Sequence, residues 1–300
     1  MLGTLRLLVA ALALPCLAGD SAYEREILRW RAAHEAEIKA DDGWLTVSGL
    51  FWLRPGRNTF GSGPDNDIVL PRGSAAARVG VFVFDGHRVR VLMEPGAGMP
   101  AREALLKSDR GGQPDLLHLG DVTLYLIERG GRYAIRMKDR NSVLRRNFRG
   151  LRWYPVKPAW RVEARFVPYD TPKSLRVATA VGGEEAYTCP GYVVFRLQGR
   201  ELQLHPVLES PDSKQLLFIF RDRTSGKETY PAGRFLYTDL PVRGRVTLDF
   251  NRAENPPCAF TPYATCPLPP RENRLPVFVR AGERDSAHHV TSGAARARYP

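Results

Sequence analysis

The sequence has few histidines and cysteines, and it lacks the short motifs of several large enzyme classes. Six histidines and four cysteines occur among 300 residues, and no two histidines have the spacing of metal ligands. No glycine-rich dinucleotide or phosphate loop, zinc-protease HExxH or GxSxG nucleophile elbow is present. We therefore expect no cofactor and no metal, and the chemistry of those classes is not indicated.

Long apolar runs are scarce as well, because only the N-terminus carries one. One arginine precedes the apolar run 7–14, Pro15 ends it, and Ala18 occupies a position suited to cleavage. The run is too short to span a bilayer, so it predicts a signal peptide over residues 1–18 and an exported protein, periplasmic or extracellular. Lipidation of Cys16 is not expected, because Pro15 replaces the small residue of a lipobox. No later segment predicts a transmembrane span.

Charge is plentiful but is nowhere concentrated. The formal net charge is +12, from 44 basic and 32 acidic residues, and no run of five or more basic residues occurs. Nucleic-acid binding usually needs a clustered basic patch. We therefore expect a solvated basic surface and no nucleic-acid partner.

Local patterns predict one helix followed by a mainly β body. Ser21 and Glu24 form a capping box, and apolar or aromatic residues then recur at helical spacing. The pattern predicts a helix over 22–39, within an N-terminal segment 19–42. The residues that form its stripe are Tyr23, Ile27, Trp30, His34 and Ile38.

From residue 44 onward the apolar period changes to two, which is typical of strands. Glycine-containing turns at 85–86, 130–131 and 199 predict hairpins. A further hairpin should pair 216–220 with 229–230, and 246–250 should form another strand.

Such spacing predicts two packed β-sandwich or barrel-like units, at 43–148 and 150–283. The second should contain a long Pro-rich C-terminal loop. A disordered tail is predicted over 284–300.

Removal of the signal peptide would leave three cysteines. Cys258 and Cys266 are the expected disulfide pair in an oxidising compartment, since they are close in sequence within a Pro-rich stretch. Their spacing is not that of a zinc site. Cys189 is then left over, either buried and inert or reactive.

The densest polar region lies in the C-terminal third and supplies the candidate site. Asp222, Asp249 and Glu272 are candidate catalytic acids and bases, and Arg234 could bind an anion. Further candidate binding residues, for stacking on a ring or for hydrogen bonding, are Tyr230, Tyr237, Asn251, Tyr263 and Asn273. The structural alternative is that Asp222 caps a turn, Asp249 and Arg234 form a salt bridge, and the asparagines hold the loop.

Several motifs of this region lie at 222–226, 230–236, 249–260 and 266–270. They resemble the DUF1684 family, bacterial and archaeal proteins of unknown function, and residues 44–53 with 60–61 fit the family's N-terminal half. The resemblance runs from about residue 30 to residue 283. Glu254 stands where the family usually has tyrosine, which would make a pocket there more acidic. The resemblance implies no established activity.

Three functions stay open. The first is a binding or structural module whose Pro-rich loop walls a small-molecule or glycan pocket. The second is a hydrolase-type enzyme that uses the candidate carboxylates, with Arg234 holding an anionic substrate. A thiol-based activity at Cys189 is the third. The sequence does not decide whether the protein is an enzyme, and it does not indicate an oligomeric state.

Overall fold

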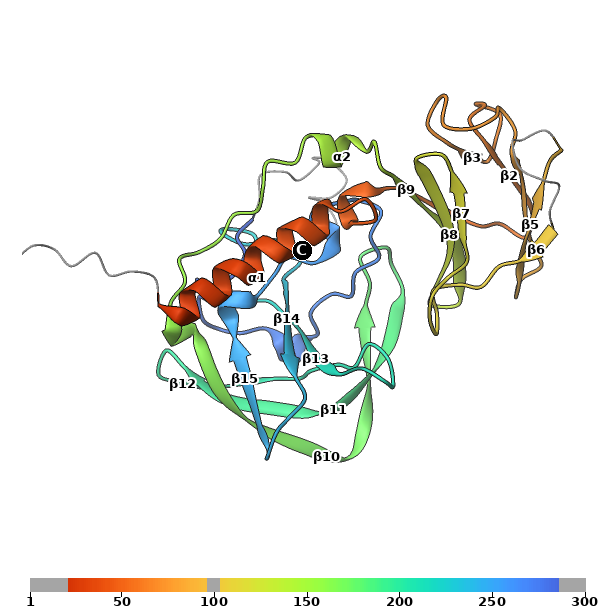
Figure 1. The fold of residues 1–300 in the computed structure, drawn as a ribbon. Coiled ribbons are helices and arrows are strands. Elements are labelled where there is room, and N and C mark those ends of the chain that lie inside the picture. Colours follow the sequence, from red (N-terminus) through yellow and green to blue (C-terminus); the bar gives the residue numbers. More distant parts are fainter. Residues whose placement is uncertain (1–20, 96–102, 286–300) are drawn as a thin grey trace, which may run out of the picture.

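A computed structural model describes residues 21–95 and 103–285 (Figure 1). The predicted signal peptide and all but two residues of the predicted tail lie outside these residues. Within them the chain is mainly β, with several sheets, one long N-terminal helix and no closed barrel. No described helix is both long and apolar enough to cross a membrane.

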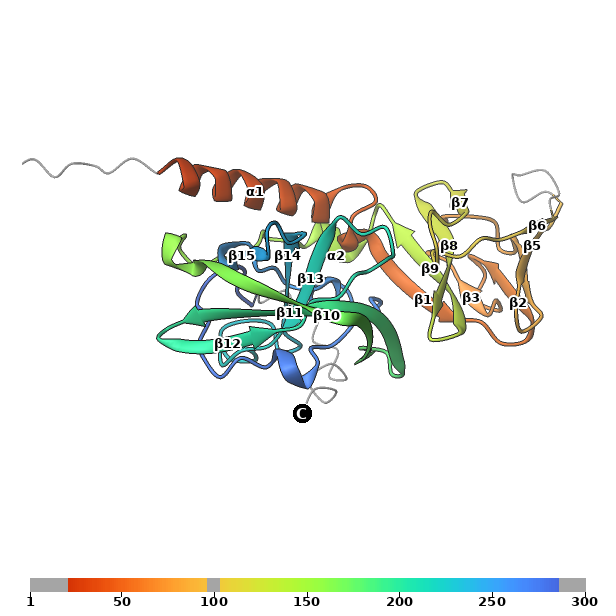
Figure 2. The same cartoon turned by 90° about the horizontal axis from the view of Figure 1, so that it is seen from below.

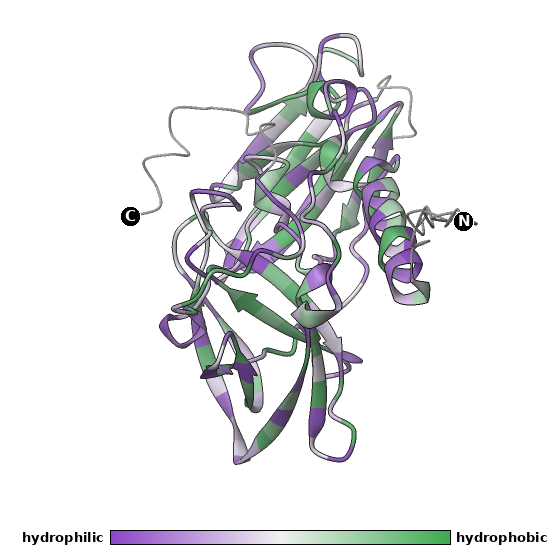
Figure 3. Cartoon of the chain, turned by 90° about the vertical axis from the view of Figure 1, so that its left-hand side faces the viewer, coloured by the Kyte–Doolittle hydropathy of each residue, from purple (hydrophilic) through white to green (hydrophobic). Residues whose placement is uncertain are grey.

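The N-terminal helix α1 (Ala22–Lys39) matches its predicted bounds. The Ser21 side chain accepts the backbone N–H of Glu24 at 3.1 Å, as an N-cap does. Figures 2 and 3 show α1 lying along one side of the C-terminal half, with hydrophobic and hydrophilic residues around its surface. It buries Ile27, Arg31 and Ile38, and Arg31 donates to the carbonyl oxygen of Tyr154 at 3.0 Å.

The N-terminal half, β1 to β9, consists of two sheets that share one apolar core. Their strand orders are β1-β9-β8-β7 and β3-β2-β4-β5-β6, and buried side chains of both sheets form a single cluster. The hairpins predicted at Asp85-Gly86 and Gly130-Gly131 are confirmed. The strands are β1 Val47–Trp52, β2 Gly56–Gly61, β3 Ile68–Val69, β4 Gly80–Phe84, β5 Val89–Met93, β6 Glu103–Leu105, β7 Leu116–Leu119, β8 Val122–Arg129 and β9 Arg132–Asp139.

The C-terminal half, β10 to Asp285, has a four-stranded sheet in the order β12-β11-β10-β15 and a two-stranded sheet of β13 and β14. The hairpin about Gly199 and the strand predicted at 246–250 are confirmed. The strands are β10 Arg161–Ala178, β11 Glu184–Leu197, β12 Arg200–Leu204, β13 Gln215–Phe220, β14 Arg234–Asp239 and β15 Arg245–Asp249. Both faces of the β13–β14 pair are buried, because its side chains alternate between two apolar clusters.

The predicted partner of β13 is wrong. β13 pairs with β14, so that Phe220 lies opposite Arg234, and 229–230 is not its partner. The reason is a closed turn, in which Thr229 donates to the carbonyl of Thr224 at 3.1 Å and Gly226 donates to that of Thr229 at 2.8 Å. These bonds hold 224–229 together as a turn, so that the strand that returns to pair with β13 begins only at Arg234.

After β15 the chain forms no further strand up to Asp285. This stretch, which we call the C-terminal segment (250–285), contains only three short 3₁₀ helices. These are η3 Phe250–Arg252, η4 Pro257–Ala259 and η5 Arg271–Asn273. The remaining short helices of the described residues are η1 Trp44–Thr46, α2 Val143–Arg146 and η2 Pro158–Trp160. The segment packs against the β body and contributes Leu275, Val277 and Val279 to the main core.

Candidate functional site

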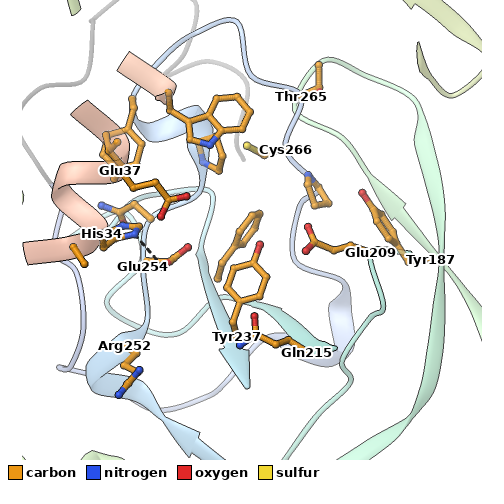
Figure 4. Close-up of a pocket in the computed structure, with 18 of the residues that line it drawn as sticks. His34, Glu37, Tyr187, Glu209, Gln215, Tyr237, Arg252, Glu254, Thr265 and Cys266 are labelled. Carbon is orange, nitrogen blue, oxygen red and sulfur yellow. Dashed lines mark ion pairs between the residues drawn. The ribbon is translucent and has the colours of Figure 1, made fainter. Parts of the chain in front are cut away.

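A cavity of about 660 Å³ lies where α1, β8, β9, β11, β13, β14 and the C-terminal segment meet. Both halves of the β body line it, and α1 forms one wall (Figure 4). Its aromatic side chains are Trp30, Trp44, Tyr187, Phe235, Tyr237 and Phe260. The long-range packing of these segments, rather than any single motif, therefore creates the cavity.

One side of the cavity carries a cluster of ionisable groups around His34. Nδ1 of His34 lies 3.4 Å from Oε2 of Glu254, and Nε2 lies 3.8 Å from Oε2 of Glu283. Glu283 is fully buried and accepts both the backbone N–H and the side-chain amide of Asn255 at 2.8 Å. The His34 ring also stacks on Trp30, with 5.4 Å between ring centroids. The imidazole is thus fixed between two carboxyl groups.

This surrounding shifts the proton affinities of both partners. Burial is the largest cause that raises the pKa of Glu254, to about 7, against the opposing effect of His34. Burial lowers the pKa of His34, but the nearby carboxylates of Glu283, Glu254 and Glu37 outweigh it, and the net direction is upward. Near neutral pH, Glu254 can therefore both hold and release a proton.

A second carboxyl group, that of Glu209, lines the opposite side of the cavity, and Tyr237 lies between the two (Figure 4). Partial desolvation raises the pKa of Glu209, while its hydrogen bond with Tyr237 lowers it. Burial, followed by the charges of Glu209 and Glu254, raises the pKa of Tyr237. Its hydroxyl group therefore stays protonated and can donate a hydrogen bond.

A basic corner lies near Thr265. Arg129 and Arg136 both donate to the Thr265 hydroxyl oxygen, at 3.1 and 3.2 Å. Arg129 also forms two hydrogen bonds with Asp109, at 2.8 and 2.6 Å. The cavity thus presents carboxyl groups and guanidinium groups from different segments. Among the described residues no cluster of three or more potential metal ligands occurs.

Comparison with known families now adds an independent observation. The model of the family described as "Protein of unknown function (DUF1684)" matches residues 146–284. Residues 146–284 of the chain belong to the DUF1684 family. The match begins near α2, so the part of the expected resemblance between residues 30 and 145 stays a prediction.

A solved relative carries no assigned activity. The chain is similar, at 35% identity, to an uncharacterised protein of Haloarcula marismortui whose structure was determined by solution NMR. The similarity covers 48% of this chain and 81% of that one, with a TM-score of 0.41. No curated protein matches the chain.

Only some of the residues that line the cavity lie within the DUF1684 match. Glu209, Tyr237 and Glu254 lie within the matched residues, whereas His34 and Arg136 precede them. Of the binding residues expected from sequence, Tyr237 lines the cavity. Glu254, singled out because the family usually has tyrosine there, lines it too. Sequence reasoning did not identify His34, Glu209 and Arg136 as site residues. His34 was assigned only to the apolar stripe of α1.

Asp222 and Arg234, from two DUF1684 motifs, pair in the protein interior. Nη2 of Arg234 lies 2.7 Å from Oδ2 of Asp222, and both side chains are fully buried. Arg234 also donates to the carbonyls of Val279, at 2.9 Å, and Ala281. The predicted pairing of Arg234 with Asp249 is wrong, because Asp222 is the partner. The hydrogen bonds of Arg234 therefore go to Asp222 and to the C-terminal segment, and neither residue of the pair lines the cavity.

Asp249 likewise binds structural partners. It accepts the Tyr23 hydroxyl at 2.8 Å, and Asn251 donates to the same hydroxyl oxygen at 2.9 Å. Glu272 is exposed, and none of Asp222, Asp249 and Glu272 lines the cavity. The three predicted catalytic carboxylates therefore do not meet there, and the ionisable groups of the cavity are other residues.

The remaining predicted binding residues also lie outside the cavity lining. Buried Asn273 donates to the carbonyls of His205 and Ile219, both at 2.9 Å. Tyr230 donates to the carbonyl of Cys258 at 2.8 Å, and Tyr263 is partly buried. The asparagine thus holds the C-terminal segment, in agreement with the structural alternative.

The three described cysteines are free thiols. The backbone N–H of Cys258 donates to Sγ of Cys266 at 3.1 Å, so the expected pair is adjacent without a disulfide bond. Cys189 is buried, and burial raises the pKa of its thiol. That environment favours an inert thiol over a nucleophile.

Proposed function

We propose that this exported protein binds a small organic molecule, of the size and polarity of a sugar, in the cavity beneath α1. The observation that carries the proposal is a set of buried polar atoms without hydrogen-bond partners on residues that line the cavity. They are Nε2 of His34, Oε1 of Glu185, Nε of Arg136 and Oδ1 of Asn255. Such atoms are rare in native proteins and mark places where a ligand or water binds.

The cavity chemistry supports a sugar-like ligand. Its volume of about 660 Å³ falls within the range of small-molecule sites. Aromatic faces such as those of Trp30 and Trp44 can stack on the apolar face of a sugar ring. Carboxyl and amide oxygens of Glu209, Glu254 and Asn255 can accept hydrogen bonds from hydroxyl groups.

A thermal-shift screen followed by calorimetry tests the proposal, using mono- and disaccharides and non-sugar carboxylates. Glu209→Gln should weaken binding of a sugar hit about tenfold, the effect of one lost hydrogen bond to a charged group. Glu201→Gln, an exposed change on β12 outside the cavity, is the matched control. The absence of any sugar hit, or equal effects of the two variants, would reject the proposal.

A second candidate function, glycoside hydrolysis, is favoured by one specific observation. Glu254 has a pKa raised to about 7, and a second carboxyl group faces the same cavity. In such a pair, the protonated carboxyl group donates to the departing oxygen and the other assists the attack of water. Glu254 would be the acid, and Glu209 the second carboxyl group.

Hydrolysis of aryl glycosides, followed against pH, tests this candidate. Glu254→Gln should abolish turnover and retain binding, and wild-type activity should fall above about pH 7 as Glu254 loses its proton. Turnover by Glu254→Gln at the wild-type rate would exclude Glu254 as the acid.

The proposal also includes export of the protein and a sandwich arrangement of the sheets in each half. An apolar cluster shared by two sheets supports a sandwich arrangement in each half. Expression with residues 1–18 present should yield a mature protein that begins at Gly19 in the periplasm or medium. N-terminal sequencing of that fraction would detect uncleaved chain, which would count against export by a signal peptide.

A further inference from the structure

Arg136 is a buried cation in the centre of a sheet. It lies on β9, between β1 and β8, and its side chain is 2% exposed. Its neighbours in sequence, Ala134, Ile135 and Met137, are apolar and buried. A charged residue at such a position costs free energy unless it is paired.

The contacts of Arg136 are neutral groups. Its guanidinium donates to the hydroxyl group of Thr265 at 3.2 Å, and it lies 5.6 Å from the ring centroid of Trp44. No carboxylate of residues 21–95 or 103–285 lies within the 4.0 Å ion-pair distance. Nε of Arg136 makes no hydrogen bond, and Arg136 lines the cavity.

Two other arginines show what a compensated guanidinium looks like in this protein. Buried Arg234 lies 2.7 Å from Asp222. Arg129, which shares the Thr265 hydroxyl with Arg136, lies 2.6 Å from Asp109 and 3.7 Å from Glu185. Asp109 and Glu185 thus face Arg129, and Arg136 is the member of this pair without a carboxylate partner of its own.

From this contrast we infer that Arg136 is an anion-binding subsite of the cavity and that the ligand carries a carboxylate. The ligand class is then an acidic sugar, such as a uronic acid, rather than a neutral one. The inference rests on the proposed function and names its ligand.

A carboxylate suits this corner better than a phosphate. A planar carboxylate can accept from Nε and a terminal nitrogen of one guanidinium together. It carries one negative charge, which matches the unpaired guanidinium of Arg136. A dianionic phosphate would bring a surplus negative charge close to Glu185 and into the cavity of Glu209.

Calorimetry with matched sugars tests the inference: D-glucuronate against D-glucose, D-galacturonate against D-galactose, and glucose 6-phosphate as the phosphate probe. Wild-type protein should bind a uronate at least about tenfold more tightly than its neutral counterpart. Arg136→Gln should remove that preference, and Arg136→Lys should restore part of it, because the charge returns without the planar fork. Arg132→Gln, on the same strand but exposed and outside the cavity, is the matched control and should bind like wild type.

The outcomes separate this inference from the proposed function. Equal binding of acidic and neutral sugars would overturn the inference and leave the proposed function standing. A preference for the uronate that is unchanged in Arg136→Gln would have the same consequence. Tighter binding of glucose 6-phosphate than of both uronates would overturn the carboxylate assignment. Failure of every sugar to bind wild-type protein would reject both.

A stability measurement guards against a folding defect. If Arg136 serves binding, replacing it with the uncharged Arg136→Met should leave the urea midpoint of the ligand-free protein unchanged or raise it. A large drop in the midpoint would show that the arginine supports the fold, and would overturn its assignment as a ligand group.

Discussion

The two halves of the β body differ in how their buried backbone groups are hydrogen-bonded. In the N-terminal half, regular strands pair their own backbone groups, and the shared core between the two sheets is apolar. In the C-terminal half, buried polar side chains accompany the apolar core. Among those around the C-terminal segment are Asp222, Arg234, Asn251, Asn255, Asn273 and Glu283.

The difference follows from where backbone hydrogen bonds can be made. A strand within a sheet satisfies its amide and carbonyl groups through its neighbours. The C-terminal segment has no ladder of its own, so side chains bind its backbone: Arg234 binds the carbonyl of Val279, and Glu283 binds the amide of Asn255. Buried polar residues here stand in for secondary structure, and each one can be removed to test the comparison.

The largest effect is expected at the buried ion pair. Arg234→Met should lower the free energy of unfolding by about 3–5 kcal/mol, because Asp222 is left as an unpaired buried charge. Urea denaturation measures it. The matched control in the N-terminal half is Arg90→Met, which removes an exposed pair with Glu103 at 2.6 Å and should cost at most about 1 kcal/mol. Similar losses in both variants would contradict the contrast between the halves.

The next effect concerns pH and Glu254. A folded-state pKa of about 7, above the ordinary 4.5, means that the folded protein holds the proton more tightly than the unfolded chain. The stabilisation is complete below pH 4.5 and disappears as the pH rises to about 7, with at most about 3 kcal/mol involved. The raised pKa of His34 acts in the same direction, because its charged form is also lost as pH rises.

Glu254→Gln should therefore flatten the dependence of the urea midpoint on pH between 4.5 and 7. Glu103→Gln, a change at an exposed carboxylate of the N-terminal half, should leave the wild-type slope unchanged. A steep slope that survives in Glu254→Gln would place its origin elsewhere.

A smaller effect is expected from oxidation of the C-terminal segment. The hydrogen bond from the Cys266 thiol is the largest cause that lowers the pKa of Cys258, and thiolate is the form that reacts. Under oxidising conditions Cys258 and Cys266 should form a disulfide that stabilises the protein by about 2–3 kcal/mol, the value for a short closed loop. Mass spectrometry of unreduced peptides identifies the bond. Cys189→Ser should leave it unchanged, and any bridge to Cys189 would refute the pairing.

The smallest effect concerns the caps of the two helices. Ser21→Ala should cost about 1 kcal/mol, because the N–H of Glu24 loses its acceptor. Ser142 similarly caps α2, accepting from Leu144 at 3.2 Å, but α2 buries none of its four residues. Chemical denaturation should show a smaller loss for Ser142→Ala. A larger one would make α2 more than a connection between the halves.

Local sequence signals predicted the elements that local physics determines. The bounds of α1 follow from a capping serine and a helical stripe, and the turn at Asp85-Gly86 requires a positive φ, which Gly86 adopts at 98°. The partner of β13 was missed because hydrogen bonds within 224–229 extend that turn by several residues. Pattern alone does not show such bonds.

The candidate site was harder to predict because it forms only through long-range packing. His34 is part of the apolar stripe of α1, and Arg136 interrupts an apolar strand. Neither residue therefore belongs to a local motif that would indicate a site. The conspicuous polar motifs, such as Asp222 with Arg234, proved to hold the C-terminal segment. Glu254 was the exception, because its departure from the family pattern is visible in the sequence itself.

The contact between His34 and Glu283 has a consequence for the timing of folding during synthesis. The two residues come from opposite ends of the described chain, yet they lie 3.8 Å apart at the cavity. The N-terminal half can fold as soon as it leaves the ribosome, since among the described residues its strands pair only with one another. The cavity needs lining residues as far along the chain as Pro267, and His34 gains its second carboxylate only with Glu283. A nascent or truncated chain that stops before them would have a finished first half and an incomplete cavity.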